Sequence, residues 1–109
     1  MTVRELTTVQ EFAIVTMPDG DREVTGAYCG DLLSWVMGRA KADDAWITIM
    51  TNANIVAVAS LSDVSVILLA EGVELSDDVK VVAEAKGVNI LVSSLPIYET
   101  AVKLSGLLV

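Results

Sequence analysis

The chain of 109 residues contains no histidine and a single cysteine. The lack of histidine removes the side chain that proteins use most often as a general base and as a metal ligand. One cysteine excludes an internal disulfide and a cysteine-based metal cluster, and it suits a reducing, cytoplasmic compartment. Since no Walker A, G-x-G-x-x-G or G-x-S-x-G sequence is present either, we expect no enzyme activity, no metal and no cofactor.

Basic residues are scarce as well, with seven Lys and Arg against 15 Asp and Glu and a net charge of −8. Nucleic acids and anionic lipid surfaces are bound largely through Lys and Arg, so we expect neither as a partner. Long apolar runs are also absent: the charge-free segment 45–62 is interrupted by Thr51, Asn52 and Asn54, which predicts no membrane span. Charges and hydroxyls in residues 1–12 predict no signal peptide.

Apolar residues make up 53% of the chain, which is enough for a hydrophobic core in one domain, residues 1–109. Apolar runs predict strands over residues 12–16, 46–50, 64–70 and 88–92, and residues 23–29 are expected to be extended. Apolar stripes and caps predict a short helix after Thr2 and further helices near 31–40, 54–61, 76–87 and 96–108. Because helices separate the last three strands, we expect a three-layer α/β fold, a largely parallel sheet with helices on both faces.

The first candidate motif lies where an extended segment is expected to turn into a helix. Thr25-Gly26 and Gly30-Asp31 bracket this turn, and amides at the start of a helix bind phosphate or carboxylate groups. Arg22 is the nearest cation and would hold such an anion with two hydrogen bonds. The alternative interpretation is structural: Gly26 gives the backbone an unusual geometry, Asp31 caps the helix and Arg22 pairs with an acidic neighbour.

A second candidate motif, Thr51 to Asn54, follows the strand expected at 46–50. Open α/β sheets usually bind ligands at the carboxyl ends of their strands, and the side chains of Thr51, Asn52 and Asn54 offer hydroxyl and amide groups there. An ordinary helix cap by one of the two asparagines explains the same residues. If both motifs form one ligand site, they must lie at the same end of the sheet or meet across a subunit interface.

The lone Cys29 precedes the expected helix start, a position where helix amides lower the pKa of a thiol. The neighbouring Asp31 opposes formation of a thiolate, and no histidine or second cysteine is present to activate it. We therefore expect Cys29 to be buried and inert, as most free cysteines are.

Two blocks of the sequence, residues 21–33 (DREVTGAYCGDLL) and 46–61, resemble the DRTGG domain, which is similar to the N-terminal domain of HPr kinase/phosphatase. The second glycine of the motif that gives this family its name is Ala27 here. With the order of the expected strands, the resemblance extends over nearly the whole chain. It implies a regulatory or assembly module without known catalysis, and the phosphate-binding loop of the kinase is missing from the sequence.

Several large apolar side chains lie outside the expected inward stripes, and the mean hydropathy is high at +0.60. These side chains are Leu32, Trp35, Ile55, Val102 and Leu107. Because exposed apolar patches usually mark interfaces, and because the family resemblance also suggests self-association, we expect a homodimer that uses the helix near 31–40 or the helix near 54–61.

The sequence thus favours a stand-alone, non-catalytic regulatory or assembly module that acts through self-association and through binding of a partner protein. The alternative is a small-molecule or nucleotide sensor that holds a small anionic ligand at the turns around Gly26–Asp31 and Thr51–Asn54.

Overall fold

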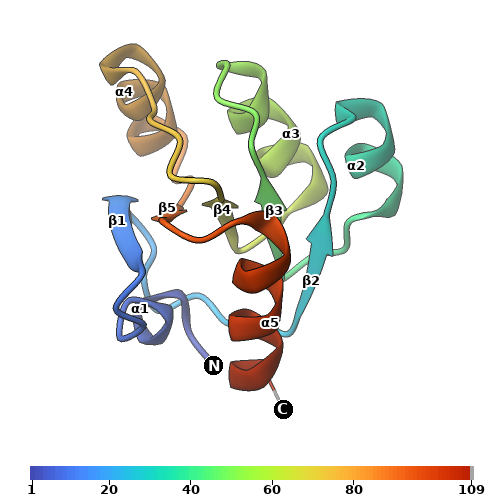
Figure 1. Cartoon of the computed structure of the whole chain (residues 1–109). Helices are drawn as coiled ribbons and strands as arrows, with labels where there is room; N and C mark the ends of the chain where they lie inside the picture. Colours follow the sequence, from blue (N-terminus) through green and yellow to red (C-terminus); the bar gives the residue numbers. More distant parts are fainter. Residues whose placement is uncertain (109) are drawn as a thin grey trace.

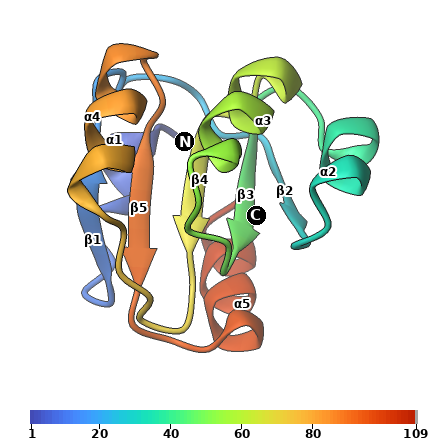
Figure 2. The same ribbon diagram turned by 90° about the horizontal axis from the view of Figure 1, so that it is seen from above.

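The computed structural model describes residues 1–108, which form one five-stranded sheet in the order β1-β5-β4-β3-β2 (Figure 2). The strands are β1 (Phe12–Thr16), β2 (Gly26–Cys29), β3 (Asp44–Thr48), β4 (Val66–Leu69) and β5 (Ile90–Ser93). The three pairs β2–β3, β3–β4 and β4–β5 are parallel. The edge strand β1 runs antiparallel to its neighbour β5. The predicted largely parallel α/β sheet is confirmed, including the parallel pairing of the last three strands.

Helices cover both faces of the sheet, as the sequence predicts (Figure 1). One face packs under α2 (Leu33–Arg39), α3 (Asn54–Ser62) and α4 (Asp77–Ala85). The opposite face packs under α1 (Val3–Leu6) and α5 (Ile97–Leu108). Within residues 1–108, no helix combines the length and the apolar character needed to cross a bilayer.

The central strands are buried on both sides, which explains their near-continuous apolar sequences. Trp46 and Ile67 point into the core beneath α2, α3 and α4, whereas Ile47 and Leu68 point into the core beneath α1 and α5. Trp46 is completely buried, and its indole N–H donates a hydrogen bond of 2.8 Å to the carbonyl of Gly30. This bond satisfies the only polar atom of the largest side chain in the core.

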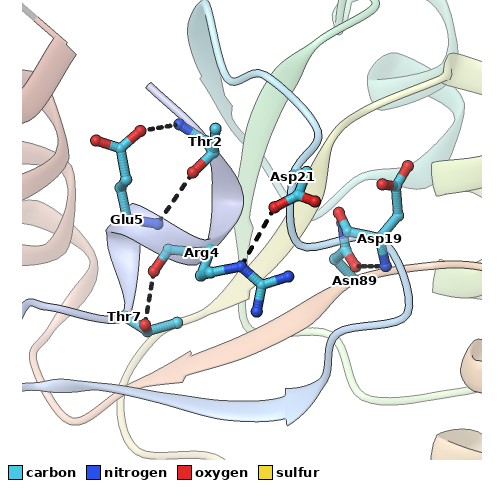
Figure 3. Close-up of polar contacts among 7 residues, drawn as sticks. All are labelled: Thr2, Arg4, Glu5, Thr7, Asp19, Asp21 and Asn89. Carbon is cyan, nitrogen blue, oxygen red and sulfur yellow. Dashed lines mark hydrogen bonds and ion pairs between the residues drawn. The ribbon is translucent and has the colours of Figure 1, made fainter.

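The short helix α1 begins with the capping box predicted from the sequence (Figure 3). The Thr2 hydroxyl accepts a hydrogen bond from the Glu5 backbone N–H, and the Glu5 carboxylate accepts one from the Thr2 N–H. Because the bond from the Thr2 N–H to the carboxylate favours the ionised form, it holds the pKa of Glu5 below its ordinary value. A four-residue helix depends on such caps, since few of its backbone groups find partners within the helix.

A buried asparagine fixes the turn between β1 and β2 (Figure 3). The Asn89 side chain donates to the carbonyls of Asp19 and Ser65 at 2.8 and 2.9 Å, and its Oδ1 accepts from the Asp19 N–H at 2.9 Å. Both ends of the amide group are therefore satisfied, as burial requires. The contact joins the predicted turn at Asp19 to the amino end of β5.

Candidate functional site

The structure places the sequence-predicted site residues at two opposite ends of the sheet. Gly26 pairs with Asp44 at the amino ends of β2 and β3, whereas Asp31 contacts Thr48 at their carboxyl ends. The amino-end group is Arg22, Thr25 and Gly26, and the carboxyl-end group is Gly30, Asp31, Thr51, Asn52 and Asn54. Since strand β2 lies between the two groups, the expectation that both motifs meet at one end of the sheet is wrong within a single chain.

At the carboxyl end, Asp31 ties two parallel strands together. Its Oδ1 accepts hydrogen bonds from the Thr48 hydroxyl at 2.7 Å and from the Ile49 N–H at 3.1 Å. The expected role of Asp31 as a helix cap is therefore wrong: α2 begins only at Leu33, after a cap position occupied by Leu32. The carboxylate is engaged with the end of β3 instead of with the helix amides.

The second motif forms the start of α3. The Asn52 side chain accepts a hydrogen bond of 2.9 Å from the Asn54 N–H, and the Asn52 carbonyl accepts one from Ile55. These bonds form a turn just before the helix, whereas the N-cap position is Ala53 without a side-chain cap, so the expected cap by an asparagine is wrong. Thr51 is half-buried, and Asn52 and Asn54 are exposed.

Gly30 permits a close contact at the end of β2. A side chain at this position would place its Cβ 2.9 Å from the Tyr28 ring, closer than such atoms approach in proteins. The Gly30 carbonyl also accepts the indole hydrogen bond of Trp46. Gly30 therefore has a packing reason to be glycine, independent of any ligand.

At the amino end, Arg22 joins two loops that are distant in sequence. Its Nη2 donates to the Asp43 carboxylate at 3.1 Å, to the Asp63 carboxylate at 2.9 Å and to the Asp63 carbonyl at 2.6 Å. Both aspartates have positive φ, 69° and 58°, so their loops turn sharply toward the guanidinium. Burial lowers the pKa of Arg22, but the hydrogen bonds to the two carboxylates outweigh it and the net shift is upward. Its partners are thus these two aspartates, and not a sequence neighbour.

Thr25 and Gly26 line a surface depression of about 430 Å³ beside strand β2. A Cβ at Gly26 would lie 2.8 Å from Asp44 Oδ1, so glycine is required by this close approach and not by a positive φ, contrary to the expected unusual geometry. Ala27 lies on an exposed part of β2 and pairs with Ala45, where no glycine is needed. The depression also contains Arg39 and Lys41, which the sequence motifs did not include.

The thiol of Cys29 is exposed on β2 and not buried as expected. Partial burial of the sulfur raises its pKa, and the nearby Asp31 carboxylate raises it further. The thiol therefore remains protonated at neutral pH, which agrees with the expectation of an unreactive cysteine.

An apolar depression lies on the outer side of α5. It measures about 650 Å³ and contains Leu95, Tyr98, Val102, Gly106 and Leu107. Tyr98 is 75% exposed and Val102 is 52% exposed, whereas Thr100 and Leu104 on the same helix are buried against the sheet. The sequence predicted Val102 and Leu107 outside the inward stripe of this helix, whereas Tyr98 and Gly106 were not among the residues predicted there.

Exposed apolar side chains also lie at α2, where Leu32, Trp35 and Met37 are 57%, 52% and 50% exposed. The Arg39 guanidinium lies 3.7 Å from the centre of the Trp35 ring and covers part of it. On α3, Ile55 is completely buried, so its expected place on an interface is wrong.

Comparison with solved structures shows what this fold resembles. The chain is similar to the CBS and DRTGG domains of the regulatory region of Clostridium perfringens pyrophosphatase, which was solved with its activator diadenosine tetraphosphate. The TM-score is 0.68 at 15% identity, and the match covers 93% of this chain and 44% of the other, so this chain spans less than half of that structure. No protein-family model and no curated protein sequence matches the chain. The likeness establishes the fold, a mostly parallel α/β sheet of the kind found in that regulatory region.

Proposed function

We propose that the chain is a DRTGG-type regulatory or assembly module of the cytoplasm, which acts without catalysis through self-association and through binding of a partner protein. The sequence blocks 21–33 and 46–61 support membership of this family, and the similar solved structure comes from the regulatory region of an enzyme.

The observation that carries the proposal is the exposed apolar stripe on α5. Tyr98 and Gly106 each lie four residues from Val102, so the stripe has an approximate two-fold symmetry about Val102. If two α5 helices pack antiparallel about this point, Tyr98 of one copy lies beside the partner's Gly106. Among residues 1–108, and apart from the backbone of α5 itself and the adjoining residues, no atom lies within 4 Å of the position that a Cβ at Gly106 would occupy, which leaves space for the tyrosine ring.

The charges beside the stripe favour a second copy of this chain as the occupant. Glu99 and Lys103 are one helical turn apart, so they lie on the same flank of the stripe, and Lys103 also pairs with Glu11 of its own chain at 3.7 Å. In the antiparallel pair, the positions of Glu99 and the partner's Lys103 are offset by about 3 Å along the helix axes, so the two charges lie close together. Two-fold symmetry produces this pairing twice. A parallel two-fold pair would place this flank against the partner's opposite flank, which carries the uncharged Ala101 and Ser105, so only the antiparallel arrangement pairs these charges between copies.

A single pair of helices buries less area than the ~800 Å² per partner of a standard interface. We therefore expect a dissociation constant in the micromolar range. Light scattering on a size-exclusion peak tests the proposal. At tens of micromolar protein and moderate salt, we expect a mass of twice 11.6 kDa. A mass that stays at one chain under these conditions rejects self-association.

The alternative function, a small-molecule or nucleotide sensor at the two turns, has weaker support. Asp31 and Asn52 already use their side-chain oxygens within the chain, and the Gly26 turn lies at the other end of the sheet.

A further inference from the structure

The basic side chains of the chain fall into two groups. Among residues 1–108, four of the seven basic side chains form ion pairs with carboxylates: Arg4, Arg22, Lys80 and Lys103. Arg22 pairs with two carboxylates and each of the others with one. The other three are Arg39, Lys41 and Lys86, which have no ion pair in the part of the chain that the structure describes. In a chain with 15 acidic residues, cations left without a carboxylate are unexpected, and two of these three line the same depression.

We propose that this depression, between β2 and the segment that links α2 to β3, binds a small molecule through a phosphate or carboxylate group held by Arg39 and Lys41. Its volume of about 430 Å³ suits a small metabolite. The Thr25 hydroxyl lies in the same depression. Because β2 is the last strand of the sheet, backbone groups on its outer side have no strand partner and add donors.

The cationic side of the site is held in place before any ligand arrives. The Arg39 guanidinium lies over the Trp35 ring at 3.7 Å, which restricts its position and leaves its N–H edge free to bind an oxyanion with two hydrogen bonds. The turn that carries Lys41 is fixed at both ends: the Lys41 N–H donates to Asp44 Oδ2 at 2.8 Å, and the Asp44 N–H donates to the Lys41 carbonyl at 3.1 Å. Ligand binding therefore requires less additional ordering of the Arg39 side chain and of the turn that carries Lys41.

Asp44 determines what else the ligand must carry. Its side chain is only 7% exposed, Oδ2 is used by the Lys41 N–H, and Oδ1 faces the bare Cα of Gly26. A carboxylate oxygen in this position repels a bare anion and accepts a hydrogen bond from an N–H or O–H group. The site therefore selects a small molecule in which an amine or hydroxyl lies a few ångströms from the oxyanion.

The site and the proposed dimer surface are independent. Tyr28 and Arg39 belong to the side of the sheet that α2 covers, whereas α5 covers the opposite face. Loss of ligand binding therefore leaves the self-association proposal standing, and a monomeric chain would still contain this depression.

A nuclear magnetic resonance titration of the full chain tests the site, with the backbone amides of residues 25–28 and the Arg39 side-chain N–H as reporters. The probes are phosphoethanolamine, inorganic phosphate, β-alanine and acetate, so the phosphate and carboxylate sources are compared with and without an amine. We expect saturable shifts at the reporters with a dissociation constant in the millimolar range, and binding at least threefold tighter for whichever amine-bearing probe matches the site.

Variants separate a site from general charge attraction. The double variant Arg39→Gln/Lys41→Gln is expected to weaken binding about tenfold or more, while Lys86→Gln removes the third unpaired cation and leaves binding unchanged. Asp44→Asn is expected to abolish the preference for amine-bearing probes, and its amide spectrum shows whether it folds. The proposal is overturned if no probe shifts residues 25–28 at 20 mM, or if Lys86→Gln weakens binding as much as the double variant.

Discussion

Helices α2 and α5 both expose apolar side chains on opposite faces of the sheet, but their surroundings differ. On α2, Trp35 is 52% exposed and lies under the Arg39 guanidinium of its own helix. On α5, Tyr98 is 75% exposed, and a Cβ at Gly106 would meet no side chain within 4 Å among residues 1–108. Exposure alone therefore does not distinguish an interface from ordinary surface; the two aromatic side chains differ in that the chain supplies a partner for Trp35, although Leu32 and Met37 near it are exposed as well.

The same distinction applies to the polar groups. Arg22 and Asp31 looked like ligand residues in the sequence, yet each is engaged by partners within the chain. Arg39 and Lys41 belonged to no sequence motif. In contrast to Arg22 and Asp31, they have no carboxylate partner among residues 1–108. Groups that the fold leaves without a partner are the better candidates for binding.

The largest effect is expected from Val102→Asp on α5. In the antiparallel pair this substitution brings two carboxylates together at the two-fold axis, where each lacks a cation and loses water. We expect the dissociation constant of the dimer to rise at least ~100-fold, so that light scattering gives a single-chain mass.

The matched control is Val81→Asp on α4, where the valine is 69% exposed and away from α5. It adds the same charge and is expected to leave the mass of the dimer unchanged. A control that dissociates to the same extent would show that added charge, and not its place on α5, separates the copies.

A smaller effect is expected from the charges on the flank of the stripe. Glu99→Lys places two lysines near each other in each half of the pair, and we expect the dissociation constant to rise about five- to tenfold at low salt. The swap Glu99→Lys/Lys103→Glu restores the opposite charges and is expected to recover most of the affinity, as measured by sedimentation equilibrium. If the swap remains as weak as the single variant, the antiparallel arrangement is wrong.

On α2, Trp35→Ala is expected to alter stability but not assembly. The change removes the contact with Arg39 and the half-buried part of the ring, so we expect the free energy of unfolding to fall by about 1 kcal/mol in urea denaturation. The dissociation constant of the dimer should stay within twofold of the original value. Loss of the dimer in this variant would place the interface on α2, one of the two helices for which the sequence predicted it.

The smallest effect concerns Cys29, beside α2. Partial burial and then the Asp31 carboxylate raise the pKa of the thiol, so less thiolate is present at pH 8 than in a free cysteine. Asp31→Asn removes the charge but keeps an oxygen that accepts from Thr48 and Ile49, and it is expected to lower this pKa. Alkylation by iodoacetamide at pH 8 should become about two- to threefold faster. If Asp31→Asn and the original chain react at the same rate throughout pH 7 to 9, burial alone raises the pKa of the thiol.

The sequence was informative wherever one segment determined its own structure. The apolar runs near 46–50, 64–70 and 88–92 predicted buried parallel strands, and the spacing of Thr2 and Glu5 predicted the capping box. The place of β1 at the far edge, antiparallel to β5, could not be predicted, because it depends on pairing between segments far apart in the chain.

The candidate site shows the same limit. The turn that Asn52 makes with Asn54 is local, and the sequence predicted a helix start here, although the N-cap position is Ala53. The partners of Arg22 lie 21 and 41 residues away, and the contact of Asp31 with Thr48 spans 17 residues, so neither role is visible in a local motif. The grouping of Arg39 and Lys41 with Thr25 likewise arises only when β2 pairs with β3.

The most direct test of self-association through α5 is a disulfide placed on its two-fold axis. In a Cys29→Ser background, Val102→Cys gives each copy a single thiol where two antiparallel helices approach most closely, within the separation that a disulfide bridges. Under mild oxidation at micromolar protein, we expect a covalent dimer on a non-reducing gel, and no such band from Leu61→Cys, whose leucine is 72% exposed on α3. If Val102→Cys forms no more covalent dimer than Leu61→Cys, the central claim is contradicted.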